Sequence, residues 1–138
     1  MYNSIIIAAA LFNEGATTRA ALDKARKLLS EGGKVTLVHV IDEIPGYVAA
    51  AIPQSQISAR RRDVEEQLAA IAGEYSDMSV STVIRQGQPS ASILGCAQEA
   101  NADLIMIASH KPGLSDYFIG STAARIVRHA QVSVLVTR

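Results

Sequence analysis

The sequence of 138 residues has no tryptophan, only six phenylalanine and tyrosine residues together, and a single cysteine, Cys96. One cysteine excludes an intramolecular disulfide framework and a four-cysteine zinc site, and it fits the reducing, cytoplasmic compartment that we expect. Thirteen basic and thirteen acidic side chains cancel, so the chain lacks the excess of positive charge with which proteins bind nucleic acid or an anionic bilayer. We therefore expect no nucleic acid and no membrane among its partners.

Long apolar runs are also missing. The opening run from Ile5 to Phe12 holds eight apolar residues, far fewer than the roughly 18 of a transmembrane helix. No basic region precedes it, as a signal peptide would require. Alanine, by contrast, is abundant, with 22 residues in a chain that is 49% hydrophobic. This composition favours one core of small side chains in a single domain, residues 1–138, because domains most often hold about 100–150 residues.

Hydrophobic periodicity predicts strands and helices in alternation. The strands are expected at residues 5–10, 34–41, 79–85, 104–108 and 132–136, and a helix is expected in each of the four intervals between them. Gly32 and Gly33 are expected to end the first helix, Pro89 to begin the third, and Ser121 to cap the fourth, with Val127 among its inward residues. Four strand–helix pairs and a final strand are typical of α/β proteins with an open, doubly wound five-stranded parallel sheet and helices on both faces.

In such sheets, ligands bind outside the carboxyl ends of the strands, where the strand order reverses. The segment after Ala108 is rich in polar residues and enters a helix at Gly120 and Ser121. A helix N-terminus has unpaired N–H groups and the positive end of the helix dipole, so it suits a phosphate. The alternative is that Gly120 and Ser121 are only a turn and a cap, which contributes about 1 kcal/mol.

Other candidate sites have weaker support. Ser109, His110 and Asp116 have the composition of a catalytic triad but lie within eight positions of one segment, without the sharp turn that presents a nucleophilic serine. His129 lies near the end of a predicted helix, where a histidine can interact favourably with the helix dipole. We therefore expect it to cap the helix and not to bind a metal. Cys96 lies beside an apolar stripe, which indicates packing and not redox chemistry.

Two surface segments are distinctive. Arg60, Arg61 and Arg62 are followed at once by acidic residues, a pattern typical of a solvated helix face with local ion pairs. The apolar stretch from Tyr47 to Ile52 lies in an expected loop. It is either a lid or partner surface, or it folds back over its own sheet, and both alternatives stay open.

The whole chain resembles the universal stress protein family, and the motifs of its second half are the specific ones. The resemblance rests on Gly87-x-Pro89, Ala102-Asp103-Leu104, Gly120-Ser121-Thr122-Ala123, Val127-Arg128-His129-Ala130 and Val134-Leu135-Val136, and in the first half on Leu37-Val38-His39-Val40-Ile41-Asp42. It implies an adenine-nucleotide alpha-hydrolase-like fold with the strand order 3-2-1-4-5. It also implies a homodimer joined through the last strand, from Val132 to Val136, and in many members bound ATP, with Mg²⁺. An unpaired apolar edge strand is itself a reason to expect such pairing.

The resemblance also implies where a nucleotide would lie. Adenosine would contact Ala9, Ala10 and Val40, and the phosphates would lie near Ala108, Ser109, His110, Lys111, Gly120, Ser121 and Thr122.

The chain departs from the family's nucleotide loop, Gly-x2-Gly-x9-Gly-[Ser/Thr]. Counting back from Gly120 puts His110 and Ile107 at the other two glycines, whereas alignment on the strand end puts Ala108 and Lys111 there. Ala10 stands where many ATP-binding members have an acidic residue.

Three functional hypotheses remain. The first is a stress-response regulatory protein that binds ATP and is not an enzyme, since the sequence offers no positioned general base or metal-binding carboxylate cluster. The second is a dimeric interaction module of the same fold that binds no nucleotide. The third, a nucleotide hydrolase, lacks recognisable catalytic groups.

Overall fold

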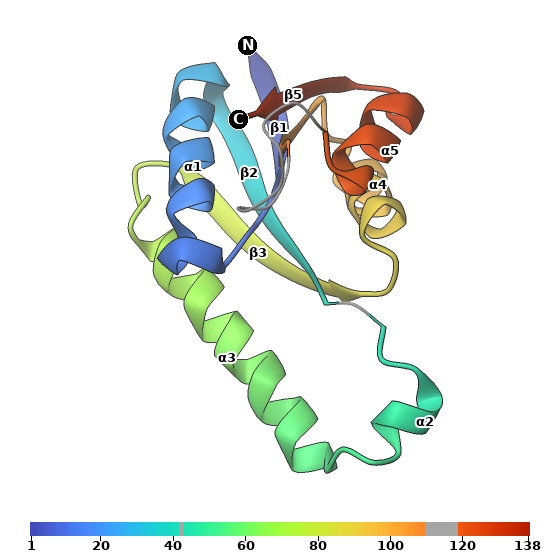
Figure 1. The fold of residues 1–138 in the computed structure, drawn as a ribbon. Coiled ribbons are helices and arrows are strands. Elements are labelled where there is room, and N and C mark those ends of the chain that lie inside the picture. Colours follow the sequence, from blue (N-terminus) through green and yellow to red (C-terminus); the bar gives the residue numbers. More distant parts are fainter. Residues whose placement is uncertain (42, 110–118) are drawn as a thin grey trace.

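The computed structural model describes residues 1–41, 43–109 and 119–138. In these residues, five parallel strands form one sheet in the order β3-β2-β1-β4-β5, which confirms the predicted α/β fold (Figure 1). The strands are β1 (Tyr2–Ala8), β2 (Leu29–Ile41), β3 (Ser79–Gln86), β4 (Leu104–Ala108) and β5 (Ser133–Thr137). The strand order reverses between β1 and β4, so the carboxyl ends of these two strands mark the expected binding crevice.

Helices cover both faces of the sheet. They are the short 3-10 helix η1 (Phe12–Gly15) and α1 (Ala16–Leu28), α2 (Gly46–Ala49), α3 (Gln54–Gly73), α4 (Pro89–Glu99) and α5 (Ser121–His129). Helices α1 and α3 lie on one face, and α4 and α5 on the other (Figure 1). Neighbouring strand residues alternate between the two cores: Ile5 and Ile7 pack with α1 and α3, whereas Ile6 packs with α4 and α5. Burial on both faces explains why β1 is a continuous apolar run.

Residues 44–62, here called the arm, project beyond the carboxyl ends of the strands as α2 and the first half of α3 (Figure 1). The Tyr47 side chain in α2 is 82% exposed. The stretch from Tyr47 to Ile52 therefore does not fold back over the sheet, and of the two alternatives the lid or partner surface remains.

The first strand and first helix end earlier than predicted. Strand β1 stops at Ala8 and not at Ala10. Gly32 and Gly33 do not end the first helix: α1 ends at Leu28, because Leu29 already has the extended angles φ −80° and ψ 133°. Both glycines instead lie in β2, whose pairing with β1 is irregular near its start.

The C-terminal elements also need correction. Gly120, and not Ser121, is the N-cap of α5, and no side chain caps that helix among the described residues. The last strand is Ser133–Thr137, one residue later than predicted. Val127 is 51% exposed and not inward, because it follows the buried Ile126 directly and is therefore about 100° around the helix from it.

Candidate functional site

The candidate site lies where the chain leaves β1 and β4 at the carboxyl edge. These strands are neighbours, with Ile7 paired to Met106. From this edge, one connection leads from β1 through η1 to α1, and the other leads from β4 to α5. The predicted site residues at the strand ends, including Val40 on the adjoining strand β2, are therefore brought to the same edge of the sheet.

The β1–α1 connection makes its hydrogen bonds within the protein. The Ala10 N–H donates to Thr18 Oγ1 at 2.8 Å, and the Thr18 hydroxyl donates back to the Ala10 carbonyl oxygen at 2.8 Å. The Ala9 N–H donates to the Val38 carbonyl oxygen at 2.8 Å, and His39 Nδ1 lies 3.3 Å from the Ala9 carbonyl oxygen. The backbones of Ala9 and Ala10 are thus held in place, and at this strand end they present methyl groups and no carboxylate.

Gly15 makes the same connection compact. It precedes α1 in the left-handed conformation, with φ +81°, which glycine adopts without steric cost. A Cβ atom at this position would lie 2.7 Å from Ile71 Cδ1 of α3. A side chain at position 15 would therefore be strained by the backbone angle and would also require the end of the Ile71 side chain to move.

The β4–α5 connection is closed at its base by hydrogen bonds. The Ser109 N–H donates to the Thr137 carbonyl oxygen at 2.7 Å, and the Gly120 N–H donates to the Ser109 carbonyl oxygen at 2.5 Å. The second bond fixes the start of α5 next to the end of β4. His110 and Lys111, both predicted site residues, and Asp116, of the rejected triad, lie outside the described residues.

The first turn of α5 leaves hydrogen-bond donors available. The first helical bond runs from the Ala124 N–H to the Gly120 carbonyl oxygen at 3.0 Å. Among the residues that the structure describes, the N–H groups of Ser121, Thr122 and Ala123 have no partner. These three donors and the positive end of the α5 dipole can bind an anion.

A depression of about 240 Å³ opens beside the end of β4, on the α1 side. It is lined by Ala16, Thr17, Ala20, Ala21 and Lys24 of α1 and by Ala108, Ser109, Thr137 and Arg138. Two of the ten predicted site residues, Ala108 and Ser109, are thus part of a hollow that also holds two cationic side chains, Lys24 and Arg138. The volume of about 240 Å³ is below the roughly 300–1,000 Å³ of most small-molecule pockets.

Sequence reasoning missed Thr18, Lys24 and Arg138. Arg138 follows the last strand, so the rule that ligands bind at carboxyl strand ends was a usable signal for it. Lys24 lies on the polar side of α1, and nothing in the local pattern sets it apart from its neighbours. A larger hollow of about 330 Å³ lies at the opposite edge, between the C-terminal ends of α4 and α5, away from the strand reversal.

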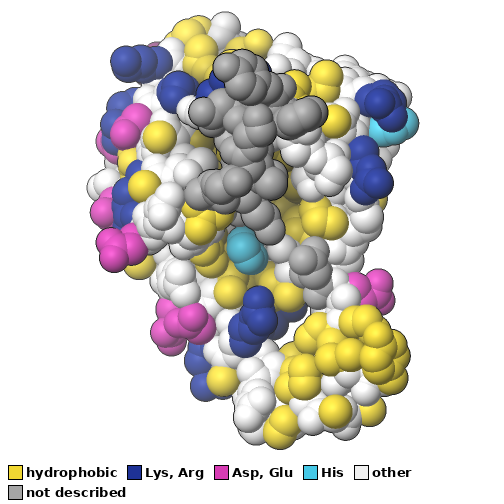
Figure 2. Space-filling view, viewed as in Figure 1, with side chains coloured by type: hydrophobic (Ala, Val, Ile, Leu, Met, Phe, Trp, Pro, Cys, Tyr) yellow, Lys and Arg dark blue, Asp and Glu magenta, His cyan; other side chains and the backbone are white. Residues whose placement is uncertain are grey.

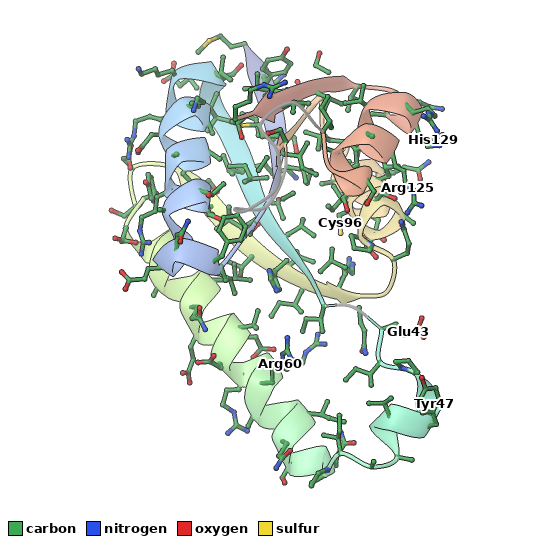
Figure 3. The ribbon with its side chains drawn as sticks, viewed as in Figure 1. Glu43, Tyr47, Arg60, Cys96, Arg125 and His129 are labelled. Carbon is green, nitrogen blue, oxygen red and sulfur yellow. The ribbon has the colours of Figure 1, made fainter. Side chains whose placement is uncertain are left out.

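The remaining candidates have structural roles. Cys96 is buried, and this burial raises the pKa of its thiol despite the opposing effect of Arg85, so the predicted packing role is confirmed. Arg61 pairs with Glu65 at 3.5 Å, one of the expected local ion pairs. His129 is exposed in the last turn of α5 (Figure 3).

Among the described residues, no three His, Cys, Asp or Glu side chains gather as a metal site. No helix in this part of the chain is long and apolar enough to span a membrane.

Comparison with known proteins gives a consistent result. The model of the universal stress protein family matches residues 1–138. Universal stress protein G of Salmonella typhimurium is 30% identical over 146 aligned residues, which cover 100% of both chains. The solved structure of UspA from Lactobacillus plantarum has a TM-score of 0.74 at 22% identity and covers 99% of this chain and 98% of its own. The universal stress protein from Archaeoglobus fulgidus, solved in complex with dAMP, has a TM-score of 0.64 at 19% identity, with coverage of 99% and 98%.

Proposed function

Because the chain belongs to the universal stress protein family, we propose that it binds an adenine nucleotide at the carboxyl ends of β1 and β4 and acts as a nucleotide-responsive regulator in the stress response. Two structural relatives support this class of ligand, since one was solved with dAMP and another with cAMP. The site that we assign has the apolar residues Ala9, Ala10 and Val40 at the ends of β1 and β2, with Ala9 and Val40 packed on opposite faces of the sheet. It has hydrogen-bond donors at the start of α5.

The observation that carries the proposal is the set of N–H groups in the first turn of α5 that have no partner within residues 1–41, 43–109 and 119–138. The bond between Gly120 and Ser109 holds these donors beside the end of β4. Phosphate oxygens accept hydrogen bonds from such amides, and the helix dipole favours their charge. Lys24 and Arg138 add positive charge at the adjoining depression. His110 and Lys111 belong to the same proposal through the family resemblance.

We propose ATP with Mg²⁺ as the natural ligand. Bound ATP would supply a polyphosphate for the α5 amides and an adenine ring for the apolar residues at the ends of β1 and β2. Mg²⁺ is commonly held by substrate phosphates, waters and one or two carboxylates. Since no three candidate metal ligands gather among the described residues, the phosphates and water would hold this ion. We propose a binding protein and not a hydrolase because the sequence offers no positioned general base.

The proposal extends to a cytoplasmic homodimer. Strand β5 pairs with β4 on one side and is the edge of the sheet on the other. Its Val134, Leu135 and Val136 side chains are only half-buried. Apolar edge strands are usually paired or covered, so β5 is the surface through which two copies would join. Sedimentation velocity tests this: a single monomeric species at micromolar concentration would contradict it.

The decisive experiment is isothermal titration of the full chain with ATP and Mg²⁺, with GTP as the control for the base and AMP as the control for the phosphates. Mass spectrometry of small molecules released from freshly purified protein is the second readout. Saturable heat with ATP, absent with GTP, supports the proposal. No heat at millimolar ATP, together with no co-purified nucleotide, would refute it.

The dimeric interaction module that binds no nucleotide remains the alternative. It is favoured by one observation: the Gly120 N–H and both backbone groups of Ala10 are already hydrogen-bonded within the protein. Under this alternative, Gly120→Val lowers stability by local strain and changes no response to nucleotide, whereas under the first proposal it also weakens ATP binding.

A further inference from the structure

One face of α3 is exposed along its whole length. Residues spaced by four, three, four, three and four positions lie along it, and all six are exposed: Ser55, Ala59, Arg62, Glu66, Ala69 and Gly73. This spacing keeps side chains on one side of a helix, so they form a continuous surface, here called the outer stripe. On the opposite side of α3, Val64, Leu68 and Ile71 pack toward the sheet. Figure 1 shows α3 at the periphery of the molecule.

The two charged residues of the outer stripe have no ion-pair partner among the described residues. Arg62 and Glu66 are four positions apart, the same spacing at which Arg61 and Glu65 pair at 3.5 Å. Their charges are therefore available to another molecule. Because one is basic and the other acidic, the complementary surface must present an acid and a base in the opposite order.

The outer stripe has that complementary order when it is reversed. Its spacing is the same in both directions, and its centre lies at position 64, midway between Arg62 and Glu66. An antiparallel second copy would therefore place Arg62 against the partner's Glu66, and Glu66 against the partner's Arg62. The same alignment places Ala59 against the partner's Ala69. A contact in which each residue meets its counterpart reciprocally is what a two-fold interface requires.

We propose that the outer stripe is a self-association surface, through which α3 packs antiparallel against α3 of a second copy. Alanine, serine and glycine flank the charges, so two helices can approach to the short end of the usual 8–10 Å range between axes. Helix α3 has 20 residues and is about 30 Å long, which makes the contact extensive. The two reciprocal ion pairs fix its register and direction.

The tip of the arm is apolar but lies apart from the outer stripe. Residues 44–53 carry no charged side chain, and the apolar side chains gather over α2 in Figure 2. Tyr47 lies on α2, away from the sheet (Figure 3). In Figure 1, α2 lies on the same side of α3 as the sheet. The outer stripe and its two reciprocal ion pairs therefore carry the proposed contact without the arm.

This surface is separate from the one proposed at β5. Helix α3 packs against the β3 side of the sheet, and β5 is the strand at the opposite edge. Both surfaces can therefore be occupied at once. The comparison of α3 variants and the cross-linking below report on contacts of α3, so their failure leaves the β5 proposal standing, and the reverse also holds.

Charge exchange tests the pairing. Sedimentation velocity from micromolar to near-millimolar concentration is run on the full chain and on Arg62→Glu, Glu66→Arg and the double variant. Each single variant creates two like-charge contacts and should weaken the association at least about tenfold. The double variant should restore it, and so should an equimolar mixture of the two single variants. Arg61→Glu, with its charge change beside the stripe, is the matched control and should have a much smaller effect.

Cross-linking tests the direction. In a Cys96→Ala background, Ala59→Cys and Ala69→Cys chains are mixed under oxidising conditions. Antiparallel packing predicts a disulfide between the two different chains and little between identical ones, since each position faces the other across the axis. Disulfides in all combinations alike, or association that the charge variants leave unchanged, would overturn the proposal. So would a chain that shows no self-association through α3 at the highest concentration. Circular dichroism of each variant establishes that it is folded.

Discussion

The two connections at the strand reversal have the same topology but use their hydrogen-bonding groups differently. Between β1 and α1, the Thr18 hydroxyl satisfies both backbone groups of Ala10. Between β4 and α5, a single bond from Gly120 to Ser109 holds the base of the connection, and the first turn of the helix keeps its donors. The first connection is therefore a structural closure, and the second is the one equipped to receive an anion.

The N-termini of α1 and α5 occupy equivalent positions at the strand reversal, but the two connections that lead to them have different roles. Both helices begin at the carboxyl edge, and both have a positive dipole end there. At α5, the N–H groups of Ser121, Thr122 and Ala123 have no partner among the described residues, and they lie beside the end of the neighbouring strand β4. Changes at Gly15 and Thr18 should accordingly alter stability, whereas changes at the start of α5 should alter ligand binding.

The largest effect is expected at Gly15. Gly15→Ala forces a side chain into a left-handed conformation and against Ile71 Cδ1 at 2.7 Å, so we expect a loss of about 2–4 kcal/mol in the free energy of unfolding. Gly32→Ala is the matched control: it also has a positive φ, of +75°, but no atom within 4 Å, and should lose about 1 kcal/mol. Urea denaturation measures both, and equal losses would show that contact with α3 is not the constraint.

Thr18→Val comes next. It keeps the shape of the buried side chain but leaves the N–H and carbonyl oxygen of Ala10 unpaired, which costs about 1–3 kcal/mol. Thr17→Val, at a half-buried neighbour on the edge of the depression, should change stability by less than about 0.5 kcal/mol. If the two variants unfold at the same urea concentration, the closure of the first connection does not depend on the Thr18 hydroxyl.

Ser121→Glu separates binding from stability. A carboxylate in the first turn of α5 interacts favourably with the helix dipole, so stability should rise by about 0.3–1 kcal/mol. The same carboxylate repels phosphate, so ATP affinity should fall at least about tenfold. Ser121→Gln, which is neutral, is the control. Thermal unfolding measures the stability, and isothermal titration measures the ATP affinity. If Ser121→Glu leaves the affinity unchanged, the phosphates do not bind at the start of α5, and the depression beside Lys24 and Arg138 becomes the candidate position.

The smallest effect is expected at the amino ends of the strands. There Asp103 accepts hydrogen bonds from the N–H groups of Asn3 at 2.9 Å and Ser4 at 3.0 Å. Partial burial raises the pKa of Asp103, but the bonds from Asn3 and Ser4 outweigh it, and the net pKa is lowered. Because the folded pKa lies below the unfolded one, the stabilisation is present above about pH 4 and is lost as the pH falls through the folded pKa.

Asp103→Asn should therefore lose about 0.5–1 kcal/mol at pH 7, a modest value because solvent screens the half-exposed carboxylate. The difference from the unmodified protein should shrink below pH 4. Urea denaturation at pH 7 and pH 3 provides the measurement, and a loss of the same size at both values would exclude an electrostatic origin.

Element type followed from local patterns, but several boundaries did not. The apolar run of β1 predicted a strand buried on both faces, and the burial of Ile5, Ile6 and Ile7 confirms it. Gly32 was misleading, because glycine favours a helix end and an irregular strand start alike, and the choice depends on pairing with β1. Thr18 was missed because its hydrogen bonds reach back eight positions to a connection whose shape no periodicity records.

The amino-acid sequence by itself determined the alternation of the five strands with four main helices and the two-sided core, because both depend on apolar spacing within a few turns of chain. It did not determine α2, which lies in a segment that was expected to be a loop. Only the tertiary structure decided which helix N-terminus keeps its donors, which strand-end backbone is already satisfied, and that Lys24 and Arg138 meet at one depression. Those outcomes depend on groups far apart in the chain arriving within hydrogen-bond distance. That convergence is a property of the packed sheet and its helices, and no local segment contains it.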